Sequence, residues 1–125
     1  MFWVIKMKMQ EKKVCLVIGA GAGIGVNVAK KFAVSGYHSV ISRRTNQQGL
    51  DFAVKNIEKE GGSATGFLIN AIEENSIENL IEKVEENIGP TYVVVFNLGS
   101  QIGNRSLSET SEKVFERGWR MATLA

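Results

Sequence analysis

The sequence has one cysteine, one proline and one histidine, and its apolar runs are only four or five residues long. The lone Cys15 excludes a disulfide framework within the chain and reads as a small buried strand residue. The lone His38 argues against a metal site or catalytic dyad built on histidines. A membrane span needs about 20 apolar residues, so no membrane partner is expected. An apolar content of 44% then indicates an ordinary globular fold.

The chain also lacks a strong charge of one sign, because 15 basic and 13 acidic residues leave a net charge of +2. These charges are mixed along the chain and form no basic stripe, which argues against a nucleic-acid partner. No basic segment precedes an apolar stretch of secretory-signal length, so a cytoplasmic location is expected. We expect residues 1–12 to form an N-terminal extension, with Met1, Met7 or Met9 as the start, and residues 13–125 to form one domain.

Short apolar runs alternate with amphipathic stretches along that domain. Strands are predicted at residues 14–18, 38–42, 64–69 and 91–96; helices separate them, and a last helix begins near Ser111. Ser76 is the predicted N-cap of the third helix. The first strand is apolar on both faces, which is typical of a parallel sheet, and the alternation predicts right-handed crossovers. The predicted fold is therefore an incomplete, Rossmann-type α/β fold, a doubly wound parallel sheet of about four strands with flanking helices.

The turn after the first predicted strand is rich in glycine and reads Gly-Ala-Gly-Ala-Gly-Ile-Gly over residues 19–25. Glycine lets a pyrophosphate approach without a Cβ in the way, and the next helix presents free amides to phosphates. A GxGxxG pattern fails, because Ile24 or Val26 stands where its last glycine belongs, whereas GxxxGxG fits without exception. The turn therefore predicts a dinucleotide site at the carboxyl ends of the strands, with a tight turn that binds no ligand as the alternative.

This glycine spacing resembles the TGxxxGxG turn of the short-chain dehydrogenase/reductase family, with Ile18 in place of the usual threonine. A second family signature, NNAG after the fourth strand, is matched at Asn97 and Gly99. The segment from Ser108 onward reads like the start of the family's next helix, so the resemblance covers Lys13 to Ala125. It implies the amino-terminal, cofactor-binding half of an oxidoreductase that transfers hydride between a nicotinamide and a carbonyl or alcohol.

The end of the second strand predicts which nicotinamide cofactor binds. An acidic residue there would hydrogen-bond the ribose 2′-hydroxyl of NAD, but Arg43 and Arg44 stand there instead. Guanidinium groups suit a phosphate, so we expect NADP(H) rather than NAD(H), with a solvated basic pair as the alternative. Asn70 occupies the place of a family aspartate that lies near the adenine. The predicted cofactor-binding residues are Gly19, Gly21, Gly23, Ile24, Gly25, Arg43, Arg44, Asn70, Asn97 and Gly99.

The resemblance also implies a catalytic tyrosine with a lysine four residues later. Tyr37 is followed at that spacing by Ile41, and Tyr92 by Phe96. We therefore expect no catalytic residue and no turnover by this chain alone. A carbonyl or alcohol substrate would then require a longer protein. The alternative function is a non-catalytic dinucleotide-binding or regulatory module.

Two surfaces are candidates for a homo-oligomer. The last helix is apolar, which indicates either packing on the sheet or a subunit interface; its large apolar residues are Phe115, Trp119, Met121 and Leu124. The fourth strand would be an unpaired edge of high β-propensity, which favours pairing with another copy.

Overall fold

A computed structural model describes residues 12–99 and 103–124, so all but the last residue of the expected N-terminal extension lies outside the described residues. Its four strands form one sheet in the order β3-β2-β1-β4, and every pairing is parallel. The predicted doubly wound α/β fold is confirmed. The elements are β1 (Val14–Ile18), α1 (Ile24–Val34), β2 (His38–Arg43), α2 (Gln47–Lys59), β3 (Ser63–Leu68), α3 (Ser76–Asn87), β4 (Thr91–Phe96), the short turn η1 (Leu107–Glu109), α4 (Glu112–Trp119) and the π-helical segment η2 (Arg120–Leu124).

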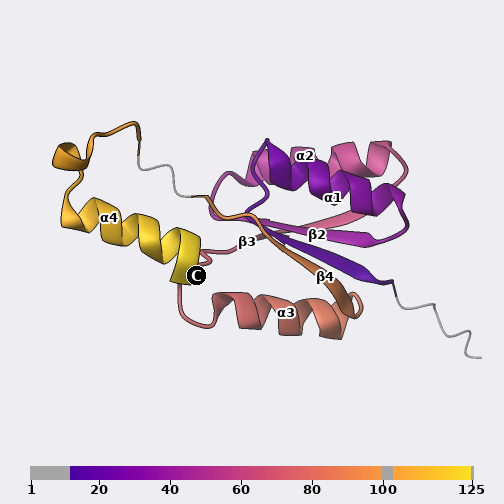
Figure 1. Cartoon of the computed structure of the whole chain (residues 1–125). Helices are drawn as coiled ribbons and strands as arrows, with labels where there is room; N and C mark the ends of the chain where they lie inside the picture. Colours follow the sequence, from indigo (N-terminus) through magenta and orange to yellow (C-terminus); the bar gives the residue numbers. More distant parts are fainter. Residues whose placement is uncertain (1–11, 100–102, 125) are drawn as a thin grey trace, which may run out of the picture.

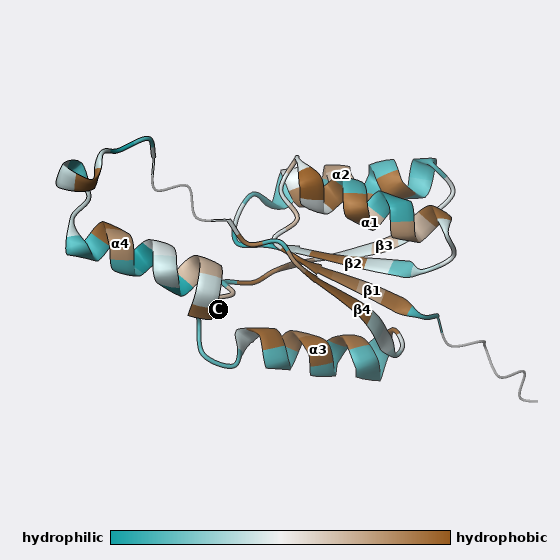
Figure 2. Ribbon diagram, viewed as in Figure 1, coloured by the Kyte–Doolittle hydropathy of each residue, from teal (hydrophilic) through white to brown (hydrophobic). Residues whose placement is uncertain are grey.

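The sheet is the middle of three layers, with α1 and α2 on one face and α3 on the other (Figure 1). β1 lies between β2 and β4 and is fully buried, as its apolar run predicts. Cys15 and Val17 belong to the core under α1 and α2, whereas Leu16 and Ile18 belong to the core against α3. Figure 2 shows hydrophobic residues along β1 and β4, and it shows α3 with a hydrophobic side toward the sheet and a hydrophilic side away from it. The carboxyl ends of all four strands therefore meet at one edge.

The start of α3 differs from the sequence prediction. Asn75, not Ser76, is the N-cap, and it adopts a left-handed conformation with φ of 59°. Asparagine tolerates this conformation better than most residues, so the chain enters the helix one residue earlier than predicted. Ser76 is the first helical residue, and its hydroxyl is buried without a hydrogen-bond partner among the described residues.

His38 has the structural role expected of it. Its ring nitrogens hydrogen-bond two hydroxyls of the neighbouring strand β3, with Nδ1 2.9 Å from the Oγ of Ser63 and Nε2 2.8 Å from the Oγ1 of Thr65. The residue is only 9% exposed. Burial lowers the pKa of the imidazole below its usual value, Lys12 lowers it further, and Glu58 opposes both. His38 therefore ties β2 to β3 as a neutral side chain at the amino-terminal edge of the sheet.

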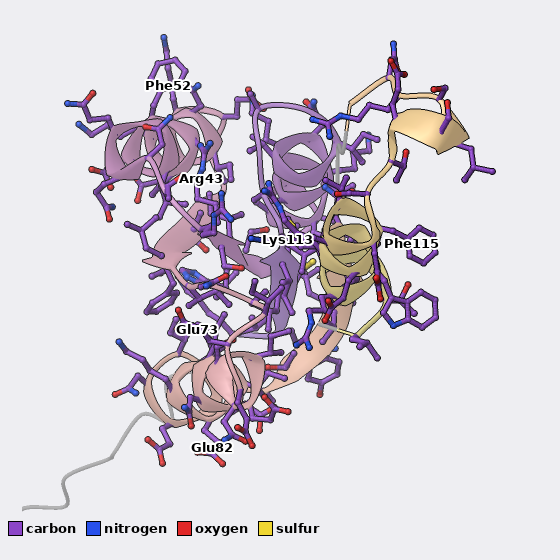
Figure 3. All side chains as sticks on the ribbon, turned by 90° about the vertical axis from the view of Figure 1, so that its left-hand side faces the viewer. Arg43, Phe52, Glu73, Glu82, Lys113 and Phe115 are labelled. Carbon is purple, nitrogen blue, oxygen red and sulfur yellow. The ribbon has the colours of Figure 1, made fainter. Side chains whose placement is uncertain are left out.

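The last helix does not pack as a whole on the sheet. α4 contains no buried residue, and Phe115 and Trp119 are 64% and 50% exposed. Phe115 points away from the rest of the molecule (Figure 3). Further along, Met121 and Leu124 border hollows at the carboxyl edge of the sheet. Phe115 and Trp119 therefore do not pack on the sheet. Among the described residues, no helix has the length and apolar character to cross a membrane.

Candidate functional site

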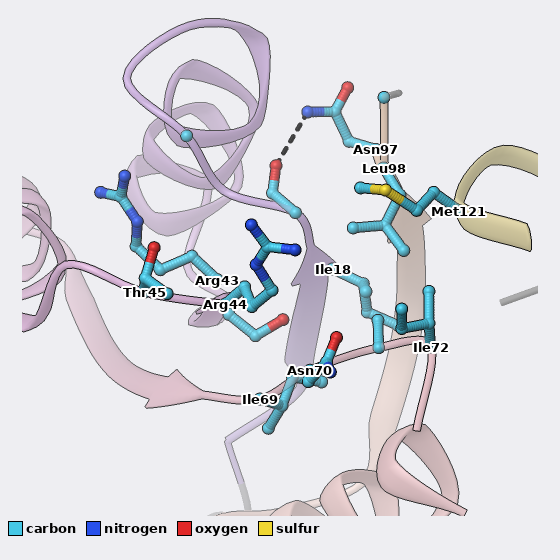
Figure 4. Close-up of a pocket in the computed structure, with 15 residues that line it drawn as sticks. Ile18, Arg43, Arg44, Thr45, Ile69, Asn70, Ile72, Asn97, Leu98 and Met121 are labelled. Atoms are coloured by element: carbon cyan, nitrogen blue, oxygen red, sulfur yellow. Dashed lines mark hydrogen bonds between the residues drawn. The ribbon is translucent and has the colours of Figure 1, made fainter. Parts of the chain in front are cut away.

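An open groove of about 270 Å³ lies at the carboxyl edge of the sheet. Figure 4 shows it between the two arginines at the end of β2, Asn70 after β3 and the loop that follows β4. A second hollow adjoins it around the start of α1. Together the two hollows are lined by every residue that the sequence predicts as cofactor-binding: Gly19, Gly21, Gly23, Ile24, Gly25, Arg43, Arg44, Asn70, Asn97 and Gly99.

Two of the glycines in the turn after β1 are required by the chain's own packing. Gly19 has a φ of +90°, and a Cβ there would lie 2.6 Å from the carbonyl oxygen of Asn97. A Cβ on Gly25 would lie 2.7 Å from the carbonyl oxygen of Gly19 and 2.8 Å from the Cα of Ala20. Backbone atoms cannot move aside cheaply, so these glycines let α1 and the loop after β4 approach the turn.

The other two glycines of the turn face open space. A Cβ on Gly21 or Gly23 would meet no atom within 4 Å. Their missing side chains therefore serve no packing within the described part of the chain and leave room for a ligand. The adjoining end of α1 has no side-chain cap and no acidic residue in its first turn, so its free amides and positive dipole end suit an anion. The turn fits the phosphates of a dinucleotide.

Hydrogen bonds hold the turn from both sides. The carbonyl oxygen of Ser42, at the end of β2, accepts from the amides of Gly19 at 3.1 Å and Ala20 at 2.7 Å. On the other side, the Nδ2 of Asn97 donates to the carbonyl oxygen of Gly19 at 3.0 Å, and its backbone amide donates to Ile18 at 2.8 Å. The turn is thus fixed relative to β2 and β4 before any ligand binds.

One end of the groove carries two cationic side chains, Arg43 and Arg44. Arg43 is half-buried and Arg44 is exposed, and neither takes part in an ion pair within residues 12–99 and 103–124. The first turn of α2 beside them contains no acidic residue. Across the groove, the Nδ2 of Asn70 donates to the Oε1 of Glu73 at 3.0 Å, which leaves the amide oxygen of Asn70 free of any hydrogen bond among the described residues. Two guanidinium groups and a helix N-terminus would attract a phosphate.

The groove also has apolar lining residues that the sequence did not mark as cofactor-binding: Ile69, Ala71, Ile72, Leu98 and Met121. The residues beside Asn70 and Asn97 could have been found from their neighbours, because consecutive residues after a strand share the same edge. Met121 gave no such signal, because its place depends on how the segment after α4 folds back.

Both tyrosines lie at the opposite edge, as their sequence positions predict. Tyr37 precedes β2 and packs edge-on against Phe32, with ring centroids 5.3 Å apart. Tyr92 is the second residue of β4, and the Nζ of Lys13 lies 4.8 Å from its ring centroid. Neither phenol can therefore reach the groove. In the described part of the chain, no group of three or more acidic, histidine or cysteine residues could hold a metal ion.

Comparisons with known proteins agree with this geometry. The sequence model of the short chain dehydrogenase family matches residues 13–123. Among curated relatives, a 2-dehydro-3-deoxy-D-gluconate 5-dehydrogenase from Formosa agariphila is 31% identical over 70% of this chain and 33% of its own length. A tropinone reductase-like protein from Erythroxylum coca is 30% identical over 89% of this chain and 43% of its own length. The chain thus spans less than half the length of these relatives.

Solved structures show the same relationship. A short-chain dehydrogenase from Rhodopseudomonas palustris is 34% identical, with a TM-score of 0.79 over 88% of this chain and 50% of that chain. The actinorhodin polyketide ketoreductase with NADPH is 28% identical, with a TM-score of 0.81 over 92% of this chain and 43% of that chain.

Proposed function

Because the chain belongs to the short-chain dehydrogenase/reductase family, we propose that residues 13–125 form the NADP(H)-binding portion of an oxidoreductase of this family. Family members bind nicotinamide dinucleotides, and the cofactor supplies hydride transfer to a carbonyl or from an alcohol. The single observation that carries the proposal is the open space over Gly21 and Gly23, on the same edge as two arginines that form no ion pair with any described residue.

Different residues of the chain bind different parts of the cofactor. Gly21 and Gly23 let the pyrophosphate reach the backbone, and the free amides at the start of α1 hydrogen-bond it. Asn97 holds the turn in the receptive shape through its bond to Gly19. Arg43 and Arg44 bind the 2′-phosphate, and Asn70 lies across the groove to hydrogen-bond the adenosine. Because the glycine turn is already ordered, little binding free energy is lost to ordering it when the cofactor binds.

The preference for NADP(H) rests on charge. No carboxylate at the end of β2 is present to accept a hydrogen bond from the 2′-hydroxyl of NAD, and two guanidinium groups stand there instead. The ketoreductase that resembles this chain carries NADPH in its structure, which supports the same choice. Titration of the purified chain with NADPH and NADH tests it: tighter binding of NADPH is expected, and equal affinities would exclude a 2′-phosphate site.

The second candidate is a dinucleotide-binding module without catalysis. Its support is that both tyrosines lie away from the groove and that neither is followed by a lysine four residues later. We expect the 125-residue chain to bind cofactor yet reduce no carbonyl compound. A transcript that continues past Ala125 into a serine and a YxxxK motif would favour the oxidoreductase; one that stops would favour the module. Measurable carbonyl reduction by the purified chain would show that this chain does contain catalytic residues.

A further inference from the structure

Gly49, in the first turn of α2, lies directly under the guanidinium group of Arg43. A Cβ built on Gly49 would be 2.8 Å from the Nη1 of Arg43 and 2.8 Å from the Nδ2 of Asn46. Both distances are shorter than real Cβ contacts, so neither neighbour could keep its position beside a larger residue. The glycine is therefore part of the arrangement that holds Arg43 at the edge of the groove.

The conformation of the helix does not itself call for glycine at this position. Gly49 is not among the residues with positive φ, and glycine in a helix is less favourable than alanine by about 1 kcal/mol. Only the close approach of the two polar side chains explains why a Cβ is excluded. This distinguishes Gly49 from Gly19, where the backbone conformation and a backbone contact both require glycine.

The position that Gly49 allows is electrostatically unfavourable without an anion. The guanidinium lies against the amino-terminal turn of α2, which carries the positive end of the helix dipole and no acidic residue. The Oδ1 of Asn46 accepts from the amide of Gly49 at 2.8 Å, and among the described residues no hydrogen bond joins it to Arg43. The groups that converge here within the described residues are thus donors: the Arg43 guanidinium and the Nδ2 of Asn46.

We propose that Gly49 is a positioning residue for cofactor specificity: its missing side chain lets Arg43 lie over the first turn of α2, where the guanidinium meets the 2′-phosphate of NADP(H). The inference rests on the proposed function. A Cβ at residue 49 displaces the ends of two side chains, those of Arg43 and Asn46, rather than backbone, so the fold is kept while the phosphate contact is lost. Gly49 touches no reacting atom and acts only through Arg43.

The test is a binding cycle on the full chain with NADPH and NADH as ligands. Gly49→Ala is expected to raise the Kd for NADPH about tenfold, as expected for loss of one charge-assisted hydrogen bond, and to change the Kd for NADH less than about twofold. Gln48→Ala, in the same helical turn, adds no atoms beside Arg43 and serves as the matched control. Thermal unfolding of each variant verifies the fold. If Gly49→Ala does not fold, it is measured together with Asn46→Gly, which removes the second side chain beside the new Cβ and suits the φ of 71° at that position.

The decisive arm combines Gly49→Ala with Arg43→Ala. If Gly49 acts through Arg43, adding Gly49→Ala to Arg43→Ala leaves the NADPH-to-NADH preference unchanged, so the two effects are not additive. The inference is overturned if Gly49→Ala weakens both ligands equally, or if its effect persists without Arg43. If Arg43→Ala alone leaves the NADPH preference intact, the proposed role of the arginine fails first, and the inference fails with it.

Discussion

The Nδ2 of Asn97 donates a hydrogen bond of 3.0 Å to the backbone carbonyl oxygen of Gly19, 78 residues earlier in the chain. The same asparagine continues β4 alongside β1, since its amide donates to Ile18 at 2.8 Å. One residue therefore joins the loop after β4 to the glycine turn. This contact gives a physical reason for the pairing of two short motifs that are far apart in the sequence.

Asn97→Ala is expected to destabilise the chain by about 1 kcal/mol, because the partly buried carbonyl of Gly19 loses one of its two donors and keeps only the amide of Gly21 at 3.1 Å. It should also weaken NADPH binding, since the glycine turn loses one of the bonds that fix its shape. Chemical denaturation and cofactor titration measure the two effects. Asn87→Ala is the matched control, because its Nδ2 bonds only the carbonyl of Lys83 on the exposed side of α3. Equal effects of the two substitutions would refute the role given to Asn97.

Alanine substitutions at the glycines should separate packing from binding. Gly25→Ala forces a Cβ against backbone atoms and should lower the free energy of unfolding by about 1–3 kcal/mol. Gly21→Ala meets open space, so it should change that free energy by less than about 0.5 kcal/mol and still weaken NADPH binding. Denaturant titration and cofactor titration give the comparison. Wild-type affinity in Gly21→Ala would mean that no phosphate approaches the turn there.

The edge strand β4 should make the isolated chain self-associate. Its side chains Tyr92, Val94 and Phe96 are exposed, and within the described residues its outer edge has no partner strand. Val94→Lys should shift the chain toward the monomer in sedimentation velocity, because a charged edge blocks strand pairing. Val34→Lys on α1 is the matched control, since Val34 and Val94 are 54% and 50% exposed. A sharp, reversible unfolding transition of a wild-type monomer would contradict this expectation.

The pH dependence of stability should reveal His38. Its pKa in the folded chain is lower than the usual 6.5 because of burial and Lys12, with Glu58 opposing. Below about 6.5 the unfolded chain binds the proton more readily than the folded chain, so the free energy of unfolding falls as the pH falls through this window. His38→Gln removes this titration and should flatten the dependence between about pH 7.5 and 5.5. An equal slope in both proteins would show that His38 does not contribute.

The sequence predicted most of the fold because its strongest signals were local. The five-residue apolar run of β1 predicted a strand buried on both faces, and the glycine spacing located the turn after it. The N-cap of α3 was missed because serine and asparagine both cap helices, and only the left-handed backbone of Asn75 favours asparagine. Gly49 and Met121 were missed because their roles depend on contacts with Arg43 and the groove, which no local pattern encodes.

A crystal structure of the chain with NADP+ would locate the cofactor outright. We expect the pyrophosphate over Gly21 and Gly23 and the 2′-phosphate within hydrogen-bond distance of Arg43 or Arg44. A cofactor bound elsewhere, or one whose 2′-phosphate points into solvent away from both arginines, would contradict this placement.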